Sequence, residues 1–355
     1  MAKQIFFAYS YEYSQEIRDW KNKANPGSRL FGLDQFFDKK NTLYHGHYLQ
    51  VTTPLIPKAG ALFKLYQACY FANHQQQYQA VVCFFESTGY WFLLLKALHL
   101  IKKPIIVFNV ALLQPQLIHG WRKTILRILL QQADGIISYA HCQHKELQRI
   151  FSLPKEKLTY MPLCIDTNYF TPVKKKTNKF ILSVGTNYGK DFGILFDIAQ
   201  DIPQDIHIIT DAKNRRQLLT RKNIPKNIII HPKPISPKTL YKYYTQATLV
   251  VLPLHPLKVS LGQTVLLESM AMGNCVIISD IPSVHDYITD TACISIPPRN
   301  ATALKNTIIA LLANKKQREL YQKNARRYVQ TQHSLNQTQA YLIRILDRCI
   351  ASTKS

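Results

Sequence analysis

The sequence lacks the signatures of several common protein classes. Its seven cysteines are widely spaced and no Cys-x-x-Cys occurs, which argues against a disulfide framework and against a structural zinc site. No Gly-x-x-x-x-Gly-Lys occurs, and no Gly-x-Gly-x-x-Gly follows the first predicted strand. ATPase and NAD-dependent chemistry are therefore disfavoured.

Acidic residues are scarce. The chain has 45 lysines and arginines against 21 aspartates and glutamates, a formal charge of +24. This charge favours an anionic partner: nucleic acid, an anionic membrane leaflet or a phosphate-bearing small molecule. Small basic clusters occur at Lys174-Lys175-Lys176, Arg215-Arg216 and Arg326-Arg327, without a basic tail or regularly spaced aromatics. This pattern argues against nucleic acid.

Long apolar runs are also missing. The most apolar window, residues 89–95, is broken by Lys96, whereas a membrane-spanning helix needs about 18–20 apolar residues. The apolar run at residues 5–9 is too short for a signal peptide. We expect a cytoplasmic protein, with peripheral contact to an anionic inner membrane surface as the possible membrane interaction.

What the sequence does contain is two successive series of alternating strands and helices. With 355 residues and 46% hydrophobic residues, two domains with separate cores are expected. The first series of strands is predicted at 4–9, 80–85, 104–108, 135–139 and 158–161. The second is predicted at 180–184, 205–210, 227–231, 247–251, 275–279 and 293–296. Such alternation is typical of βαβ units and of a mostly parallel sheet.

The series divide the chain into domains. We expect an α/β fold with two Rossmann-like domains, residues 1–172 and 173–330, that face each other across a cleft. Residues 331–355 are predicted to form a helix that packs back toward the first domain. Ligands of such sheets bind at the carboxyl ends of the strands.

The segment 258–280 carries the strongest functional pattern. A buried strand ends at Pro253, a polar loop leads to a helix that starts near Gly262, and the helix ends at Gly273. A helix N-terminus offers backbone N–H groups and partial positive charge to a diphosphate. Glu268 lies four residues after Thr264, on the same helix face, where its carboxylate can accept both hydroxyls of a ribose.

At these residues the sequence resembles the retaining glycosyltransferases of the GT-B fold, family-4 type, also called glycosyltransferase group 1. The family pattern is an acidic residue, glycine two places later, a hydrophobic pair, Glu, a small residue, Met-Ala-x-Gly and a following strand. The matching run is Gly262, then Leu266-Leu267-Glu268-Ser269-Met270-Ala271-Met272-Gly273, then Val276-Ile277.

A second segment, residues 183–192, is similar to the family's first loop in the nucleotide-binding domain. Lys190 matches the family's second basic position, and the first falls on Thr186 or Asn187. The resemblance implies that Lys190 is the catalytic cation beside the departing diphosphate, where it stabilises developing charge, with Thr186 and Lys258 as further donor contacts.

Two further segments fit the resemblance. Residues 157–172 are similar to the family's interdomain stretch, Pro-x-Gly-x-Asp followed by Phe-x-Pro, with Cys164 in place of the glycine. In the first domain, Gly32 matches the glycine-bearing loop that approaches the donor, although a plain turn explains it equally well.

One position departs from the family. Ser260 stands where the family has its first glutamate, a residue near the hydroxyls of the donor sugar. This change leaves the identity of the sugar open. Gln263 and Thr264 are candidates to replace the missing carboxylate, so Ser260, Gln263 and Thr264 are all included in the predicted substrate site.

The resemblance implies transfer of a sugar from a UDP- or GDP-sugar, with retention of configuration, to a glycan, lipid-linked or other hydroxyl acceptor, as in polysaccharide biosynthesis. No cofactor and no metal are expected, and no Asp-x-Asp, the metal-holding pair of GT-A enzymes, occurs. Two alternatives stay open: a non-catalytic GT-B subunit or nucleotide-sugar-binding protein, and a sugar-nucleotide epimerase on the same fold.

Overall fold

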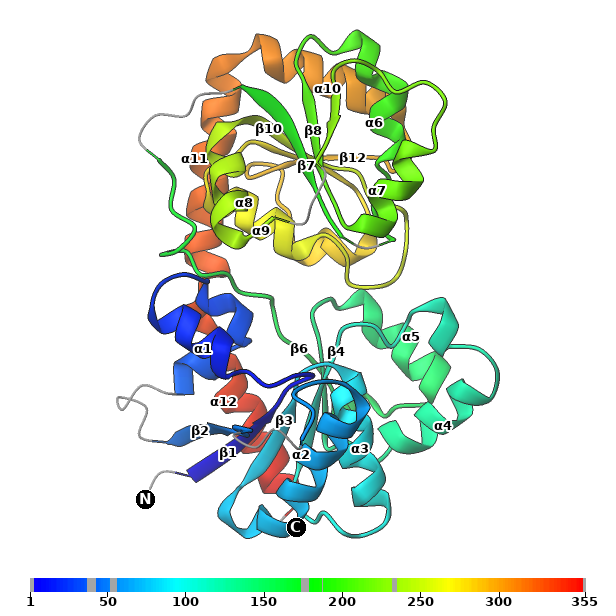
Figure 1. Cartoon of the computed structure of the whole chain (residues 1–355), viewed down its shortest axis with the longest axis vertical. Coiled ribbons are helices and arrows are strands. Elements are labelled where there is room, and N and C mark those ends of the chain that lie inside the picture. The colour runs from blue at the N-terminus through cyan, green and yellow to red at the C-terminus, as the bar shows by residue number, and fades with distance from the viewer. Residues whose placement is uncertain are drawn as a thin grey trace. The chain divides into compact units, whose positions relative to one another are not determined.

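The computed structural model describes residues 3–36, 43–51, 56–173, 179–186, 188–231 and 235–353. The chain forms two compact units, Met1–Pro162 with Leu335–Ser355, and Leu163–Ser334 (Figure 1). The sequence had placed the limits at 172 and 331. The basic cluster Lys174–Lys176 and Asn187 lie outside the described residues. Each unit contains a parallel six-stranded sheet with flanking helices, which confirms the predicted α/β class.

The first unit is built on a sheet with the strand order β2-β1-β3-β4-β5-β6. Five of its strands match predicted ones, and the edge strand β2 was not predicted because Tyr-His-Gly-His-Tyr lacks a run of β-branched residues. The strands are β1 (Lys3–Ala8), β2 (Tyr44–Tyr48), β3 (Ala80–Cys83), β4 (Ile105–Asn109), β5 (Gly135–Ser138) and β6 (Leu158–Tyr160). The helices are α1 (Ser14–Lys21), α2 (Gly60–His74), α3 (Glu86–Ala97), α4 (Gly120–Leu130), α5 (Cys142–Phe151) and α12 (Leu335–Ser352).

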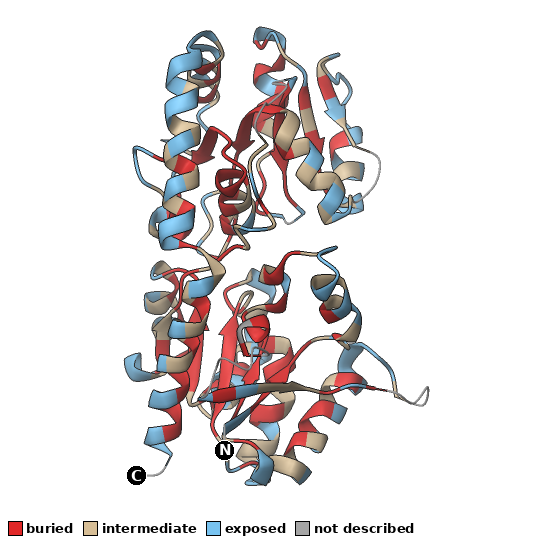
Figure 2. Cartoon of the chain, turned by 90° about the vertical axis from the view of Figure 1, so that its left-hand side faces the viewer, coloured by how far each residue is buried: buried red, intermediate tan, exposed pale blue. Residues whose placement is uncertain are grey.

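Helix α12, the last helix of the chain, completes the core of the first unit. Leu342 and Leu346 are among its buried residues, and Figure 2 colours the chain by burial. The Tyr44 hydroxyl donates a hydrogen bond of 2.5 Å to Asp347 Oδ1. Gly32, at φ +99°, lies against the same helix, where an added Cβ would come within 2.6 Å of Leu342 Cδ1. The glycine at position 32 therefore serves close packing in the first unit.

The second unit has the strand order β12-β11-β10-β7-β8-β9, with all strands parallel. Its strands are β7 (Phe180–Val184), β8 (Ile206–Ile209), β9 (Ile228–Ile230), β10 (Ala247–Leu252), β11 (Val276–Ser279) and β12 (Ile294–Ile296). Its helices are α6 (Gly193–Ile198), α7 (Ala212–Leu219), α8 (Pro237–Gln246), α9 (Gln263–Ala271), α10 (Ala301–Ala313) and α11 (Lys315–Gln332).

The order of the strands fixes where a ligand can bind in the second unit. The first strand, β7, pairs with β10, and the chain runs outward from this pair in opposite directions. Ligands of open parallel sheets bind at the carboxyl ends of the strands at such a reversal point. Alternate side chains of β7 enter the cores on the two faces of the sheet, Leu182 on one and Ile181 on the other. Within the described residues, no helix is long and apolar enough to cross a membrane.

Replacing Gly32 with alanine should destabilise the first unit by roughly 2–3 kcal/mol, because the new Cβ meets Leu342 and the backbone has positive φ. Gly60→Ala is the matched control: Gly60 has φ +84°, but no atom lies within 4 Å of its added Cβ. We expect Gly60→Ala to cost only about 1 kcal/mol in urea unfolding. Equal losses for the two variants would show that α12 does not enforce the glycine at position 32.

Candidate functional site

Two loops meet at the reversal point of the second sheet. The first follows β7 and begins at Gly185, and the second follows β10 and begins at Pro253. The amide of His255 donates to the carbonyl of Gly189 at 2.9 Å, and the amide of Asp191 donates to the carbonyl of Pro253 at 2.9 Å. The backbone thus clamps the two predicted motifs together, although about 70 residues of sequence separate them.

Lys190 lies at the centre of this clamp. The residue is only 8% exposed, and its Nζ is buried without a hydrogen-bond partner in the described structure. Its aliphatic chain crosses Gly185, where an added Cβ would come within 2.0 Å of Lys190 Cε. Burial lowers the pKa of Lys190 from 10.5 to about 8. A buried ammonium without a partner is costly, and an anion brought to it would relieve that cost.

A pocket of about 420 Å³ adjoins Lys190, and it contains polar residues that sequence reasoning missed. It is lined in part by Asp191, Asn214, Arg221 and His255, and Asp191 Oδ2 lies 3.6 Å from His255 Nδ1. Asn214 lies on α7, and Arg221 follows that helix. No local pattern marked them, because only the pairing of β7 with β8 brings α7 to this loop.

Helix α9 begins beside the clamp. Its N-cap is Gly262, at φ +85°, and no side chain caps the first turn. An added Cβ on Gly262 would come within 2.8 Å of Leu254 Cδ1, so the left-handed conformation and the close approach both require glycine. Thr264 is exposed in the first turn. The start of α9 can therefore present backbone N–H groups to a ligand, as the sequence predicts.

Glu268 lies one turn further along α9 and is half-buried. Its Oε2 accepts a hydrogen bond of 3.0 Å from the hydroxyl of Tyr244, a fully buried residue of α8. Burial, with a further contribution from the Glu268 carboxylate, raises the pKa of Tyr244 well above 10. Tyr244 is thus a neutral donor that orients the carboxylate, and sequence reasoning missed it because α8 carries no motif.

The remaining predicted residues of the second unit differ in exposure. Thr186 and Lys258 are exposed, and Ser260 is half-buried. Gln263 is buried, and its Nε2 donates a hydrogen bond of 2.7 Å to the carbonyl of Ser283. Its amide therefore ties α9 to the segment after β11.

Gly32 belongs to the first unit, whereas the other predicted site residues belong to the second. No group of three or more potential metal ligands occurs among the described His, Cys, Asp and Glu residues.

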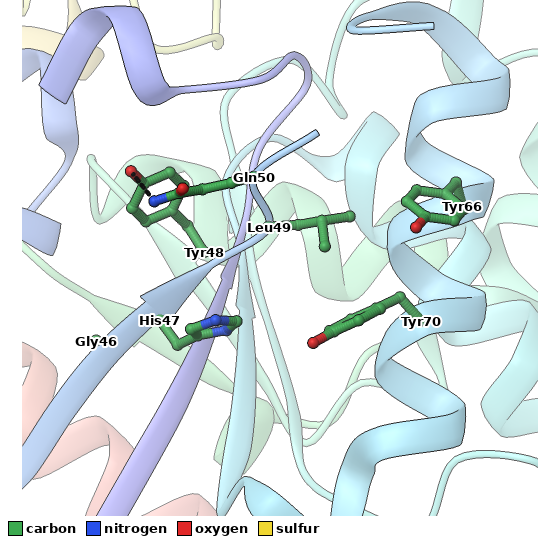
Figure 3. A pocket seen from close by; sticks show the side chains of 7 residues that line it. All are labelled: Gly46, His47, Tyr48, Leu49, Gln50, Tyr66 and Tyr70. Carbon is green, nitrogen blue, oxygen red and sulfur yellow. Dashed lines mark hydrogen bonds between the residues drawn. The ribbon is translucent and has the colours of Figure 1, made fainter. Parts of the chain in front are cut away.

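A second pocket, of about 560 Å³, lies in the first unit between β2 and α2 (Figure 3). His47 and Tyr70 point toward one another across it, and Tyr66 lies above Tyr70 on the same helix. His47 Nδ1 lies 2.9 Å from the hydroxyl of Tyr78, and burial lowers the pKa of His47. Aromatic faces with polar tips of this kind can contact the apolar faces and the hydroxyls of a sugar.

Comparisons with known proteins find a family match in the second unit. Residues 166–328 match the family model of glycosyl transferases group 1. No curated protein matches the chain. The match ends within α11 and contains both clamped loops, α8 and α9.

Several solved structures resemble most or all of the chain. A sucrose-phosphate synthase from Thermosynechococcus elongatus aligns over 99% of this chain and 100% of that chain, with 16% identity and a TM-score of 0.74. HepE from Anabaena, solved with UDP-glucose, aligns over 98% and 100%, with 13% identity and a TM-score of 0.70. TarM from S. aureus, solved with fondaparinux, α-GlcNAc-glycerol and UDP, aligns over 79% and 58%, with 14% identity and a TM-score of 0.62.

At these identities, the structural similarities establish the fold. The family match and the site geometry concern the same residues of the second unit. The chain has the GT-B fold, and its residues 166–328, slightly under half of the chain, match the family model of glycosyl transferases group 1.

Proposed function

We propose that the chain transfers a sugar from a UDP- or GDP-sugar to a glycan, lipid-linked or other hydroxyl acceptor, with retention of configuration and without a metal ion. The family match supports glycosyl transfer. HepE was solved with UDP-glucose, and TarM with UDP and a GlcNAc-glycerol, which supports a nucleotide-sugar donor and a glycan acceptor.

The observation that carries the proposal is the buried, unpartnered ammonium of Lys190. A diphosphate beside Lys190 would supply the missing counter-charge. As the sugar bond breaks, negative charge grows on the departing phosphate, and the fixed ammonium stabilises that charge in a site with little water. The Lys190 cation would therefore bind the donor and also lower the barrier to its cleavage.

The start of α9 and Glu268 would hold the rest of the nucleotide. Backbone N–H groups after Gly262 and the positive end of the helix favour phosphate oxygens. Glu268, fixed by Tyr244, would accept hydrogen bonds from the ribose hydroxyls. Ser260 has only a hydroxyl where relatives have a carboxylate, so it would read the donor sugar differently.

The acceptor proton would pass to the departing phosphate on the donor face, which requires no separate base. For the acceptor itself, the pocket between β2 and α2 is the candidate in the first unit, because Tyr66, Tyr70 and His47 combine ring faces with polar atoms.

The proposal is tested by incubating the protein with UDP- and GDP-sugars, with and without glycan acceptors, in the presence of EDTA. Released nucleoside diphosphate reports turnover, and NMR of the product reports the anomeric configuration. Loss of turnover in EDTA, or an inverted product, would refute metal independence or retention. Binding of UDP without turnover would favour the non-catalytic alternative, for which the Ser260 replacement is the supporting observation.

Lys190→Ala should lower kcat/KM by about 10²- to 10³-fold, because it removes the cation that stabilises the leaving diphosphate. Lys238→Ala is the matched control, since Lys238 is an exposed lysine on α8 and belongs to neither of the two clamped loops. Steady-state kinetics with a saturating acceptor measure both variants. Wild-type turnover of Lys190→Ala would remove Lys190 from the mechanism.

Glu268→Gln should raise KM for the donor by roughly 10-fold, because a neutral amide accepts the ribose hydroxyls less strongly than a carboxylate. Tyr244→Phe should raise KM by a smaller factor through lost orientation. Glu319→Gln, at an exposed position of α11, should leave KM unchanged. An unchanged KM in Glu268→Gln would show that the ribose binds elsewhere.

Donor binding should weaken as the pH rises above about 8, the pKa of the free Lys190 ammonium. Affinity for UDP, measured by calorimetry, is expected to fall by up to about tenfold per pH unit above that value in the wild type. The Lys190→Met variant should bind more weakly at pH 7 and show a flatter profile. Identical pH profiles would mean that Lys190 does not touch the diphosphate.

The lowered pKa of Lys190 also makes the free energy of unfolding depend on pH, and this dependence has the opposite sign to that of donor affinity. The folded pKa of Lys190 lies below its unfolded value, so between pH 8 and 10.5 the unfolded state binds more protons and stability rises with pH. Without ligand, Lys190→Met should therefore be more stable than the wild type at pH 7, by roughly 1–3 kcal/mol. Urea unfolding at pH 7 and pH 9.5 should show this gain shrinking.

A further inference from the structure

Helix α4 of the first unit exposes an apolar stripe. Trp121 is 70% exposed, Ile125 is 47% exposed and Ile128 is 57% exposed. Their spacing, i, i+4 and i+7, places them on one side of the helix, whereas Leu126 and Leu130 are its buried positions. The helix thus has two apolar faces, and only the face with Leu126 and Leu130 is needed for the core of the unit.

The same helix carries basic residues. Arg122 and Arg127 are exposed and Lys123 is half-buried, and none of them makes an ion pair with a described residue. The Arg122 guanidinium lies 5.5 Å from the centre of the Trp121 ring. A tryptophan beside arginines on an exposed helix combines a large apolar surface with positive charge.

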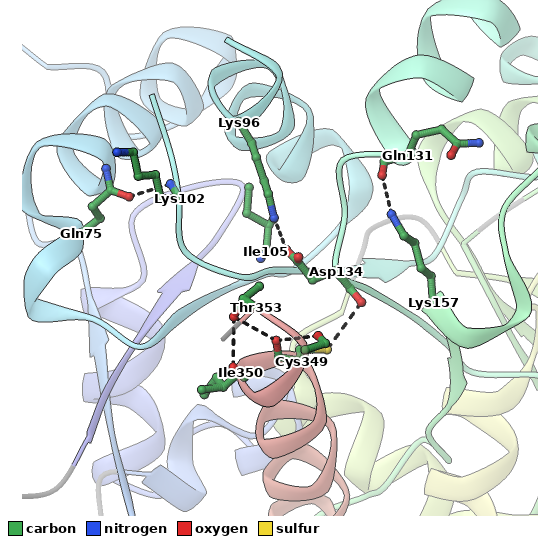
Figure 4. A network of polar contacts seen from close by, with 11 residues as sticks. Gln75, Lys96, Lys102, Ile105, Gln131, Asp134, Lys157, Cys349, Ile350 and Thr353 are labelled. Carbon is green, nitrogen blue, oxygen red and sulfur yellow. Dashed lines mark hydrogen bonds and ion pairs between the residues drawn. The ribbon is translucent and has the colours of Figure 1, made fainter. Parts of the chain in front are cut away.

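Acidic residues are almost absent around this surface. Between residues 87 and 145, Asp134 is the only acid, while the same stretch has seven lysines and arginines. Asp134 is engaged, because its Oδ2 is paired with Lys96 and also accepts from the amide of Ile105 (Figure 4). On the neighbouring helix α5, Glu146 is paired with Arg149 at 2.6 Å. Asp134 and Glu146 are therefore paired, and the exposed Glu156 lies beyond the end of α4, in the segment that Lys157 joins to Gln131.

We propose that the stripe of Trp121, Ile125 and Ile128, with the flanking Arg122 and Arg127, docks the protein on the surface of an anionic lipid bilayer. Apolar side chains on an amphipathic helix enter the boundary between headgroups and acyl chains, and tryptophan favours that depth. Lysines and arginines next to them are attracted by the negative potential of the leaflet. The inference concerns the lipid surface, and it does not depend on the donor site in the second unit.

The charge of this surface disfavours the other occupants. A second copy meeting it through a symmetric contact would bring two basic helices together, and the like charges would repel. A nucleic acid would satisfy the basic residues but would leave the Trp121, Ile125 and Ile128 stripe in water. An anionic bilayer satisfies both halves of the surface.

The test is sedimentation of the full-length protein with vesicles, without donor. Vesicles of phosphatidylcholine alone are compared with vesicles that contain phosphatidylglycerol. We expect binding to the anionic vesicles that weakens with salt. Trp121→Ser with Ile125→Ser should reduce the partition coefficient by roughly tenfold or more. Arg122→Gln with Arg127→Gln should reduce it by about 30-fold on anionic vesicles only.

Matched controls come from α11 in the second unit. Leu320→Ser replaces a leucine that is 58% exposed, and Lys316→Gln with Lys323→Gln removes two exposed lysines. Both should bind vesicles like the wild type. The proposal is overturned if the wild type does not sediment with anionic vesicles or if the stripe variant binds normally. It is also overturned if that variant instead abolishes a concentration-dependent dimer in analytical ultracentrifugation.

Discussion

The pairing of β7 with β10 is the constraint on which the nucleotide site depends. These two strands are distant in sequence. The strands that follow β7 are added on one side of the pair, and the strands that follow β10 are added on the other. Two loops therefore leave the sheet side by side at the carboxyl ends of these strands, and no other strand lies between them. The backbone hydrogen bonds of His255 with Gly189 and of Asp191 with Pro253 join the two loops. These contacts position Lys190, Asp191 and His255, and α9, which follows the second loop, positions Glu268. Asn214 and Tyr244 come from α7 and α8.

The burial of Lys190 costs free energy in the absence of a ligand. A lysine that could extend into water is held instead across Gly185, with its ammonium buried and its pKa lowered by burial. The fold maintains this arrangement because the surrounding strands are fully buried and the clamp fixes the backbone. Glu268 is the opposite case, a carboxylate that already has a donor in Tyr244. The Lys190 ammonium has no hydrogen-bond partner in the described structure, whereas the Glu268 carboxylate is already oriented by Tyr244.

In the first unit, one set of residues fills the core and another set forms the exposed basic surface. Helix α12 comes from the end of the chain, yet it fills the core against Gly32 and Tyr44, so the unit needs both ends of the sequence. Helix α4 buries Leu126 and Leu130 and leaves its other side exposed. The network around Asp134, which joins Lys96, Ile105 and Cys349, uses the one acidic residue of that region for structure. The positive charge of the surrounding surface is therefore left uncompensated.

The sequence by itself predicted most of the strands and marked the segments of the candidate site. Buried strands of the two sheets appear as continuous apolar runs, and the start of α9 is marked by Gly262, whose conformation only glycine adopts easily. Glu268 and Lys190 were found because each lies within a local motif. The sequence did not predict the strand β2, the role of Tyr244, or the pocket residues Asn214, Arg221 and His255. Tertiary structure alone decided these, because strand order and helix packing bring together residues whose local sequence carries no sign of their partners.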